Sequence, residues 1–225
     1  MGLRREFDIL PGITTVIGSG GKTTLLRMLG EELAMRRKRV ILTTTTHILP
    51  FAGMPQINAA SGAEVEWAFE NGYLICCGIP QGENGKLAAP GVSIAELAKH
   101  ADDVLVEGDG SRQLPLKAHG PQEPVIPPES GQVICVVGLS GIGRPIAEVC
   151  HRPELYAWLA GAREEEDVTP QMAAQVLERE HLASVYLLNQ ADTPEREAAG
   201  EQLGRLLRGT VHIGSLQKGS WRCLL

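Results

Sequence analysis

The sequence predicts an α/β fold with a doubly wound, mainly parallel sheet of the nucleotide-binding type and a small hairpin or loop insertion. Apolar, β-branched runs at residues 13–17, 39–46 and 104–106 have the length and composition of buried strands. Leucines and a methionine at helical spacing separate the first two runs, which makes a βαβ unit of about 35 residues. We therefore expect one domain over residues 1–225, with a ligand at the carboxyl ends of its strands.

Composition and charge argue against several kinds of partner. The chain carries a formal charge of −6 and only 4% aromatic residues, which disfavours nucleic acid, because binding it needs a basic face and stacking side chains. The five cysteines form no regular framework, and the chain shows neither a signal-like segment nor a run of membrane-spanning length. These features predict a cytoplasmic protein without a membrane partner.

The first strand ends in GSGGKTT, residues 18–24, which predicts a phosphate-binding loop. Glycine permits backbone conformations that other residues avoid, so several N–H groups can converge on one anion at the start of the next helix. Val16 stands where the usual consensus has glycine, and the short loop is similar to that of Mur-type ATP-dependent amide ligases. The predicted nucleotide-binding residues of this loop are Gly18, Ser19, Gly20, Gly21, Lys22, Thr23 and Thr24.

Each polar residue of the loop has a predicted task. Lys22 would reach the β- and γ-phosphates of ATP or GTP, and the Thr23 hydroxyl would hold Mg²⁺. The alternative is a strand–turn–helix corner in which the glycines serve packing and Lys22 is solvated. Residues 39–46 end in four threonines, of which Thr45 is a further candidate for the metal, with an ordinary strand end as the equal alternative.

The next part of the chain predicts supporting elements. We expect a helix at residues 62–71, a short strand at 73–78, a hairpin insertion at 78–91, and a helix at 93–101 that begins at a Ser93 cap. Residues 103–110, DVLVEGDG, follow as a buried strand that ends in acidic side chains. Glu107 and Asp109 would point to the same side if the strand continued.

These two carboxylates and the cations after them form the second predicted site. We expect Asp109 to hold Mg²⁺ together with Thr23, and Glu107 to serve as the reserve metal ligand or to orient water. Arg112 or Lys117 would stabilise phosphate charge in the transition state, as catalytic or substrate-binding cations. The alternatives are a turn in which Asp109 only caps the strand, and surface roles for both cations.

A proline-rich connector is predicted over residues 111–131, and a buried strand over 132–140. His151 and Arg152 precede a predicted helix at 154–160, where they would bind an anionic substrate or serve as capping or salt-linked residues. Thr169 and the proline after it open a further helix.

The third predicted site lies where the strand at residues 185–188 ends in Asn189-Gln190-Ala191-Asp192. This sequence resembles the N-K-x-D motif of GTPases, with glutamine in the lysine position. Asn189 would hydrogen-bond a purine edge and Asp192 would accept donors from guanine. The alternative is a polar strand end that caps a helix at 194–207. Residues 209–216 are predicted to form the last strand.

Several segments in this order resemble the selenium-dependent molybdenum hydroxylase accessory protein family. They are GSGGKTTLL, VILTTTTHI, VEGDGSRQLPLKA, EPVIP, HRPE and LLNQAD. The resemblance implies a cytoplasmic, P-loop NTPase-like protein that matures molybdenum hydroxylases, with a hydroxylase or the molybdenum cofactor as its partner.

The residues support three functions. The protein is a Mg²⁺-dependent NTPase whose hydrolysis drives a switch that loads a client enzyme, or an ATP-dependent small-molecule kinase or Mur-like ligase, or a nucleotide-binding module without turnover. In the second case, Arg112, Lys117, His151 and Arg152 would form the acceptor site. The choice between ATP and GTP and the oligomeric state are left open.

Overall fold

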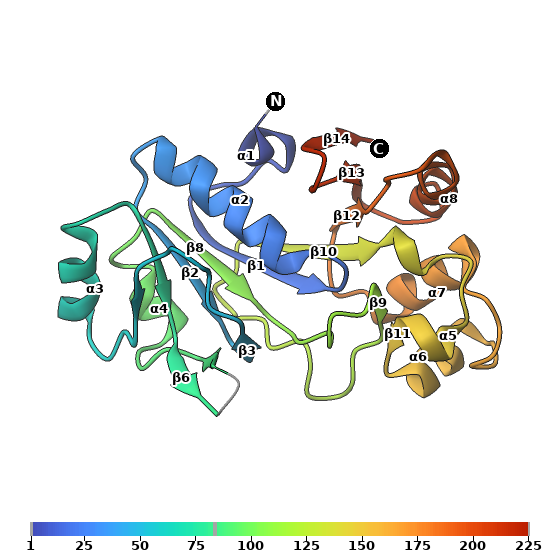
Figure 1. Ribbon diagram of the computed structural model, residues 1–225, viewed down its shortest axis with the longest axis horizontal. Coiled ribbons are helices and arrows are strands. Elements are labelled where there is room, and N and C mark those ends of the chain that lie inside the picture. Colours follow the sequence, from blue (N-terminus) through green and yellow to red (C-terminus); the bar gives the residue numbers. More distant parts are fainter. Residues whose placement is uncertain (1, 83–84, 225) are drawn as a thin grey trace. The chain divides into compact units, whose positions relative to one another are not determined.

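Strand β1 (Gly12–Gly18), helix α2 (Lys22–Met35) and strand β2 (Val40–Thr44) form the predicted βαβ unit (Figure 1). The computed structural model describes residues 2–82 and 85–224. Its chain divides into two units, which we describe separately. Unit 1 contains the residues up to Val16 together with Thr23–Gly110 and Val125–Gln132; unit 2 contains Ile17–Lys22, Ser111–Pro124 and the chain from Val133 onward. The prediction of a single domain is not tested by this division.

The sheet of unit 1 is parallel, as predicted. β1 pairs with β8 (Asp103–Glu107), β8 with β2, β2 with β5 (Leu74–Cys77), and β5 with β4 (Gln56–Ile57). The hydrogen bonds align Val16 and Thr44 on either side of Glu107. The carboxyl ends of three neighbouring strands therefore meet at one edge of this sheet.

Helices cover both faces of this sheet, so unit 1 is doubly wound (Figure 1). On one face, Gly30 of α2 lies so close that a Cβ there would be 3.0 Å from side-chain atoms of Leu42 and Leu74. On the other face, Ile41 and Val104 belong to the core that α3 (Gly62–Phe69) and α4 (Ile94–Leu97) complete. Alternate residues of each strand thus serve opposite faces.

Short elements complete unit 1. Helix α1 (Leu3–Glu6) precedes β1 in the chain. Within the predicted hairpin insertion, whose residues 83–84 lie outside the described part of the chain, β6 (Ile79–Gln81) and β7 (Lys86–Ala88) pair antiparallel as a hairpin requires, and β3 (His47–Ile48) adds to β7. The Ser93 cap is also confirmed, since its hydroxyl accepts a hydrogen bond from the Glu96 N–H at 3.1 Å.

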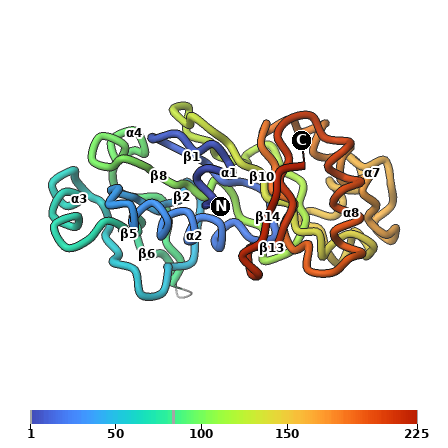
Figure 2. The backbone as a smooth tube through the Cα atoms, turned by 90° about the horizontal axis from the view of Figure 1, so that it is seen from above, coloured from blue at the N-terminus to red at the C-terminus, as the bar shows by residue number. Residues whose placement is uncertain are grey.

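The main strands of unit 2 are also mostly parallel. β10 (Gln132–Gly138), β12 (Val185–Asn189) and β13 (Thr210–Ser215) are parallel, and β14 (Ser220–Cys223) runs antiparallel to β13. Figure 2 shows β13 and β14 side by side near the C-terminus. The strand predicted at residues 209–216 is confirmed as β13, but it is not the last strand, because the tail returns along β13 as β14.

The helices of unit 2 are α5 (Ile146–Val149), α6 (Pro153–Ala160), α7 (Pro170–Glu180) and α8 (Pro194–Gly204), with a 3-10 turn η1 at Leu139–Gly141. Thr169 caps α7 as predicted, and Thr193 caps α8 in the same way. A Cβ on Gly200 of α8 would collide with Ile213 and Leu139, which shows how closely α8 packs on the sheet.

The predicted connector at residues 111–131 contains a strand. β9 (Leu116–Lys117) pairs in parallel with β11 (Cys150–His151), a pairing that the sequence did not predict. Two-residue strands have no alternating pattern, and the partner lies far away in the sequence, so local residue patterns cannot reveal them. Among the described residues, no helix has the length and apolar character needed to cross a membrane.

Candidate functional site

The glycine-rich loop of unit 2 has a conformation that only glycine adopts easily. Gly18, Gly20 and Gly21 have φ values of +89°, +87° and +138°. A Cβ at these positions would collide with the carbonyl of Val136, the backbone of Gly138 and the side chain of Asn189, respectively. The glycines therefore allow the loop to run directly against its neighbours, as a backbone cradle for an anion requires.

Hydrogen bonds fix this loop in place. The Ser19 N–H donates to the Val136 carbonyl at 2.8 Å, and the Ser19 hydroxyl donates to the Leu114 carbonyl. The Asn189 amide donates to the Gly20 carbonyl at 2.7 Å, and its oxygen accepts from the Leu216 N–H at 3.0 Å. Asn189 is thus a structural clamp of the loop; its predicted contact with a purine base stays a prediction.

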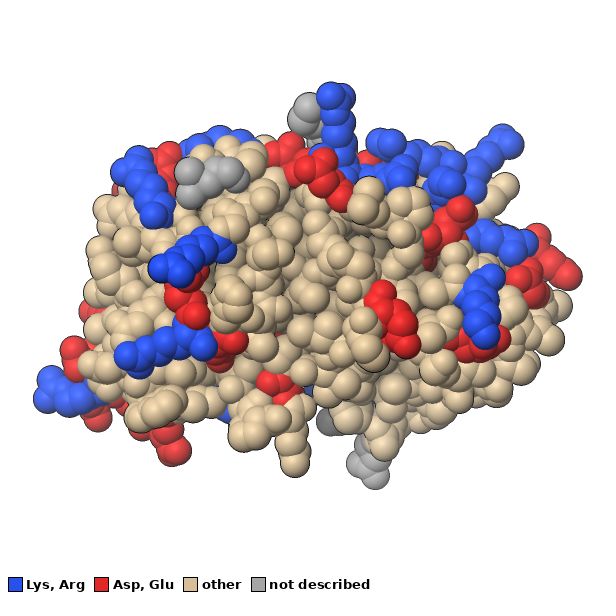
Figure 3. All heavy atoms as spheres, turned by 180° about the vertical axis from the view of Figure 1, so that it is seen from behind, with Lys and Arg blue, Asp and Glu red and all other residues tan. Residues whose placement is uncertain are grey.

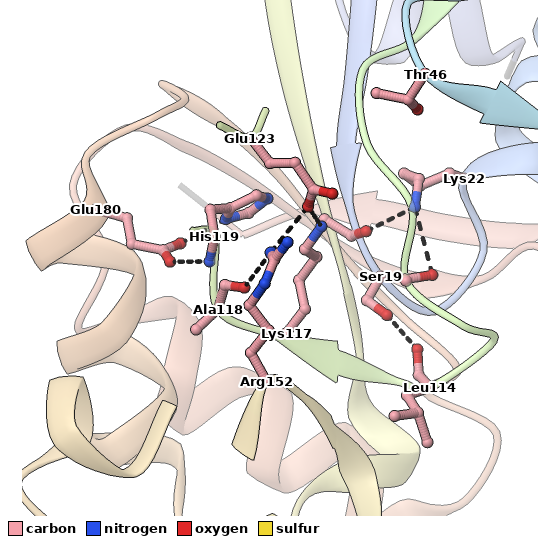
Figure 4. Close-up of polar contacts among 12 residues, drawn as sticks. Ser19, Lys22, Thr46, Leu114, Lys117, Ala118, His119, Glu123, Arg152 and Glu180 are labelled. Carbon is pink, nitrogen blue, oxygen red and sulfur yellow. Dashed lines mark hydrogen bonds and ion pairs between the residues drawn. The ribbon is translucent and has the colours of Figure 1, made fainter. Parts of the chain in front are cut away.

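Lys22 is the first residue of α2 and lies over the loop (Figure 4). Its side chain is buried, with the residue 4% exposed, and the ammonium donates to the Gly18 carbonyl at 2.7 Å and to the Ser111 hydroxyl at 3.4 Å. The first N–H groups of a helix have no partner within that helix, and the helix dipole is positive at that end. Lys22, Thr23 and Thr24 supply these N–H groups, so this helix start suits an anion.

The acidic residues lie in unit 1, at the end of β8. Glu107 faces the α2 side of the sheet, because Val104 and Val106 take the opposite face. The Thr23 hydroxyl donates to Glu107 Oε2 at 3.1 Å, and Glu107 is only 6% exposed. The strand ends at Glu107, so the condition under which the two carboxylates would share one side is not met, and Asp109 lies buried in the following loop.

A hydroxyl and a carboxylate in contact are the oxygen ligands that Mg²⁺ prefers, so Thr23 and Glu107 fit the predicted metal. The contact favours Glu107 over Asp109 as the partner of Thr23. Thr45, the further candidate, donates its hydroxyl proton to the Val125 carbonyl at 2.7 Å, and its metal role stays a prediction.

A second polar cluster occupies unit 2 around β9 and β11 (Figure 4). Lys117 Nζ and Arg152 Nη1 each lie 2.9 Å from the same oxygen of Glu123. Burial alone would raise the pKa of Glu123, but hydrogen bonds from Arg152 and Lys117 outweigh it and hold the pKa below its ordinary value. Burial, and then the charges of Lys117 and Arg152, lower the pKa of His151. The structure thus brings together three of the four predicted acceptor-site residues and adds Glu123, which sequence reasoning missed.

Arg112, the fourth predicted acceptor-site residue, is exposed and has a φ of +49°. Its charge also lowers the pKa of His151, so it lies within electrostatic reach of the cluster. Glu123 is the one acidic residue in the proline-rich sequence of residues 121–128. Its charge is opposite to that of Lys117, and this is the sequence signal that could have identified it.

A small apolar cavity lies beneath the loop within unit 2. Gly18 and Ser19 line it on one side, and Cys135, Tyr156 and Val176 are among the residues that line the rest. Its volume of about 20 Å³ has room for roughly one water molecule. This cavity is therefore too small for a substrate.

Asp192 is the last predicted base-contact residue. Its Oδ2 atom lies 3.5 Å from Nη1 of Arg196, which is in the first turn of α8. Gln190 has a φ of +68° and accepts a hydrogen bond from the Ser140 hydroxyl at 2.6 Å. These contacts support the strand-end alternative locally, and the guanine contact of Asp192 stays a prediction.

On the face drawn in Figure 3, Lys and Arg side chains and Asp and Glu side chains are both present, many of them close to one another. This pattern agrees with the formal charge of −6. Positive groups that could meet an anion are therefore local features of the loop and of the cluster.

Comparison with known proteins identifies relatives of this chain. A family model described as "YqeC protein" matches residues 14–154, which include the loop, both carboxylates of the second predicted site and the cluster, and end before Asn189. The chain is 33% identical over 157 residues to the Escherichia coli (strain K12) protein whose name is "Uncharacterized protein YqeC". The matched part is 67% of this chain and 61% of that relative, so the chain spans less than two thirds of the relative's length.

Proposed function

The chain belongs to the YqeC protein family, and we propose that it is a Mg²⁺-dependent nucleoside triphosphate-binding protein that hydrolyses its nucleotide. The observation that carries this proposal is the loop at residues 18–22, whose positive-φ glycines could not carry a side chain and which ends at the buried Lys22. A backbone cradle followed by a lysine at a helix start is what phosphate binding needs.

Each residue has a proposed task. Lys22 and the N–H groups of the loop bind the β- and γ-phosphates, and Thr23 with Glu107 holds Mg²⁺. When bound, the metal would neutralise charge on the phosphates. Asp109 orients the water and Arg112 stabilises the charge that develops on the leaving phosphate.

The cellular role that we propose is the maturation of selenium-dependent molybdenum hydroxylases in the cytoplasm. It rests on the resemblance of the ordered segments from GSGGKTTLL to LLNQAD. The partner would be a molybdenum hydroxylase or the molybdenum cofactor. Hydrolysis that a partner protein stimulates would support this role.

Substitution of the loop lysine tests nucleotide binding. Lys22→Met removes the ammonium but keeps an unbranched side chain of nearly the same length, so we expect the affinity for ATP or GTP with Mg²⁺ to fall about 100-fold. Lys99→Met is the matched control, because the Lys99 side chain is 69% exposed and, among the described residues, forms an ion pair only with the nearby Glu96. Affinities are measured by calorimetry, and equal affinity in wild type and Lys22→Met would refute the proposal.

The same titrations decide the base. If Asn189 and Asp192 contact guanine, GTP displaces ATP from the protein, and Asp192→Asn removes that preference. Equal affinity of the wild type for both nucleotides would reject the guanine site. That result would not contradict the proposed phosphate site, because the hydrogen bond from Asn189 to the Gly20 carbonyl holds the loop whichever base is bound.

The Lys117–Glu123–Arg152 cluster favours a second candidate function, an ATP-dependent kinase or ligase that acts on a small acid. A small acid that accelerates turnover would support this function, whereas acceleration by a partner protein supports the first. Tight nucleotide binding without turnover in either assay would identify a nucleotide-binding module.

A further inference from the structure

The strongest unexplained feature of unit 2 is the buried hydroxyl of Tyr156 on α6. The residue is only 2% exposed, and within the described residues its hydroxyl has no hydrogen-bond partner. A phenol hydroxyl donates one hydrogen bond and accepts others, and buried hydroxyls in proteins almost always have a partner. We therefore expect the partner of this hydroxyl to be a molecule other than the chain itself.

The Tyr156 hydroxyl keeps its proton. Burial, and then the nearby Cys150 and Glu180, raise the pKa of Tyr156 well above its ordinary value of 10. Ionisation thus cannot remove the proton near neutral pH, and the hydroxyl remains a hydrogen-bond donor. Because the described part of the chain supplies no acceptor for this proton, the partner has to be a molecule that can accept a hydrogen bond.

Tyr156 lines the small cavity beneath the glycine-rich loop. Apolar side chains of β10 and α7, such as Val137 and Val176, form much of the wall, and Gly18 and Ser19 form the side toward the loop. The volume of about 20 Å³ has room for roughly one water molecule. A molecule that binds the Tyr156 hydroxyl inside this cavity therefore has to be about as small as water.

Ser19 offers the complementary group on the side of the loop. Its hydroxyl donates its only proton to the Leu114 carbonyl (Figure 4), so toward a bound molecule its oxygen can act only as an acceptor. Lys117 and His119 also line the cavity, but their side-chain nitrogen atoms already contact carboxylates. The bound molecule thus has to accept from Tyr156 and donate to Ser19. Water does both, whereas an ammonium ion cannot accept and a halide ion cannot donate.

We propose that this cavity holds one structural water molecule, which accepts a hydrogen bond from the Tyr156 hydroxyl and donates one to the Ser19 hydroxyl. Buried water molecules commonly bind polar groups that the chain itself leaves unsatisfied. The water links α6 to the glycine-rich loop, two segments that lie far apart in the sequence. The inference goes beyond the nucleotide proposal, because the water binds without nucleotide.

Two tyrosine variants distinguish this water molecule from any other internal water. Tyr156→Phe removes the hydroxyl and keeps the ring, so the number of long-lived internal water molecules should fall by about one. Tyr186→Phe is the matched control in the same unit, because Tyr186 is also 2% exposed but its hydroxyl donates to the Ala183 carbonyl at 2.9 Å. This control should retain the number of internal water molecules found in the wild type.

Magnetic relaxation dispersion of the water oxygen counts these molecules on the full chain without nucleotide, and thermal melts verify that each variant is folded. Equal counts in the wild type and Tyr156→Phe would overturn the inference, as would an equal loss in Tyr186→Phe. Lys22→Met should lose nucleotide but keep the water, so failure of one proposal is distinguishable from failure of the other.

A high-resolution crystal structure of the wild type gives a second test that depends on no variant. Ordered water within hydrogen-bond distance of the Tyr156 and Ser19 hydroxyls would support the inference. A dry cavity, or a protein group that accepts the Tyr156 proton, would overturn it.

Discussion

The glycine-rich loop and the Lys117–Glu123–Arg152 cluster belong to the same unit, and both offer positive groups to an anion by different means. The loop relies on backbone shape, because its glycines adopt positive φ values and lie where a Cβ would collide. The cluster relies on side-chain charge and already contains a carboxylate. A site built from backbone shape should fail when a single methyl group is added, whereas a site built from side-chain charge should respond mainly to changes of charge.

The largest expected effect comes from a methyl group in the loop. Gly20→Ala changes no charge, but its Cβ would collide with the backbone of Gly138 at a φ of +87°. We expect loss of measurable nucleotide binding and a decrease of about 3 kcal/mol in the free energy of unfolding. Nucleotide calorimetry and denaturant unfolding measure the two effects.

Gly143→Ala separates the collision from the backbone strain. Gly143 has a φ of +78°, but a Cβ there would meet no atom of the described residues within 4 Å. The strain alone costs about 1 kcal/mol, and nucleotide binding should be unchanged. If both alanine variants behave alike, close packing is not what makes the loop depend on glycine.

A smaller effect is expected where a side-chain charge supports the proposed metal. Glu107→Gln should reduce the gain in nucleotide affinity that Mg²⁺ provides by about tenfold, because the Thr23 hydroxyl contacts this carboxylate. Asp109→Asn is the paired variant, since Asp109 lies beyond the end of β8. Nucleotide affinity is titrated against Mg²⁺ for both. A larger loss in Asp109→Asn than in Glu107→Gln would indicate that Asp109 is the metal ligand, as the sequence predicts.

Local patterns predicted the parts of the molecule that local chemistry determines. The run of β-branched residues, the glycines and the leucines at helical spacing predicted β1, the loop and α2, because each signal lies within the element that it specifies. Caps such as Ser93 and Thr169 were predictable for the same reason, since cap and helix are neighbours in the chain.

Contacts between distant segments were not predictable in this way. Lys117, His151 and Arg152 were candidates for an anion site, but their meeting depends on the β9–β11 pairing of residues 34 apart, and the partner Glu123 had no motif. Conversely, the Asn189 motif predicted a base contact, whereas the structure shows its amide bound to the loop backbone. A sequence motif indicates which donor and acceptor groups could bind a ligand. The tertiary fold determines which of these groups already form hydrogen bonds within the protein.

The pH dependence of the free energy of unfolding tests how much the charge of Glu123 stabilises the Lys117–Glu123–Arg152 cluster. The pKa of Glu123 is held below its ordinary value of 4.5. A lowered pKa contributes stability at pH values above the ordinary pKa, and this contribution is lost as the pH falls through the pKa of the folded state. Glu123→Gln should therefore cost about 1 kcal/mol near pH 7 and less in acid. Denaturant unfolding at a series of pH values measures the difference, and a cost independent of pH would contradict the charge-based account.

The smallest effect is expected at Asp103, at the opposite end of β8 from Glu107. Asp103 is 1% exposed, and within the described residues neither carboxylate oxygen has a hydrogen-bond partner. Burial raises the pKa of Asp103 above its ordinary value of 3.8, and the charge of Arg4 opposes this rise.

The sign is opposite to that of Glu123. A raised pKa gives stability that is fully present below the ordinary value of 3.8 and is lost as the pH rises through the pKa of the folded state. Asp103→Asn cannot ionise, so near pH 7 it should be more stable than the wild type by about 0.5 kcal/mol, with the gain disappearing in acid. In one pH series, Asp103→Asn and Glu123→Gln should deviate from the wild type in opposite directions. Deviation in the same direction would show that burial of a carboxylate, and not the cations around it, determines its effect on stability.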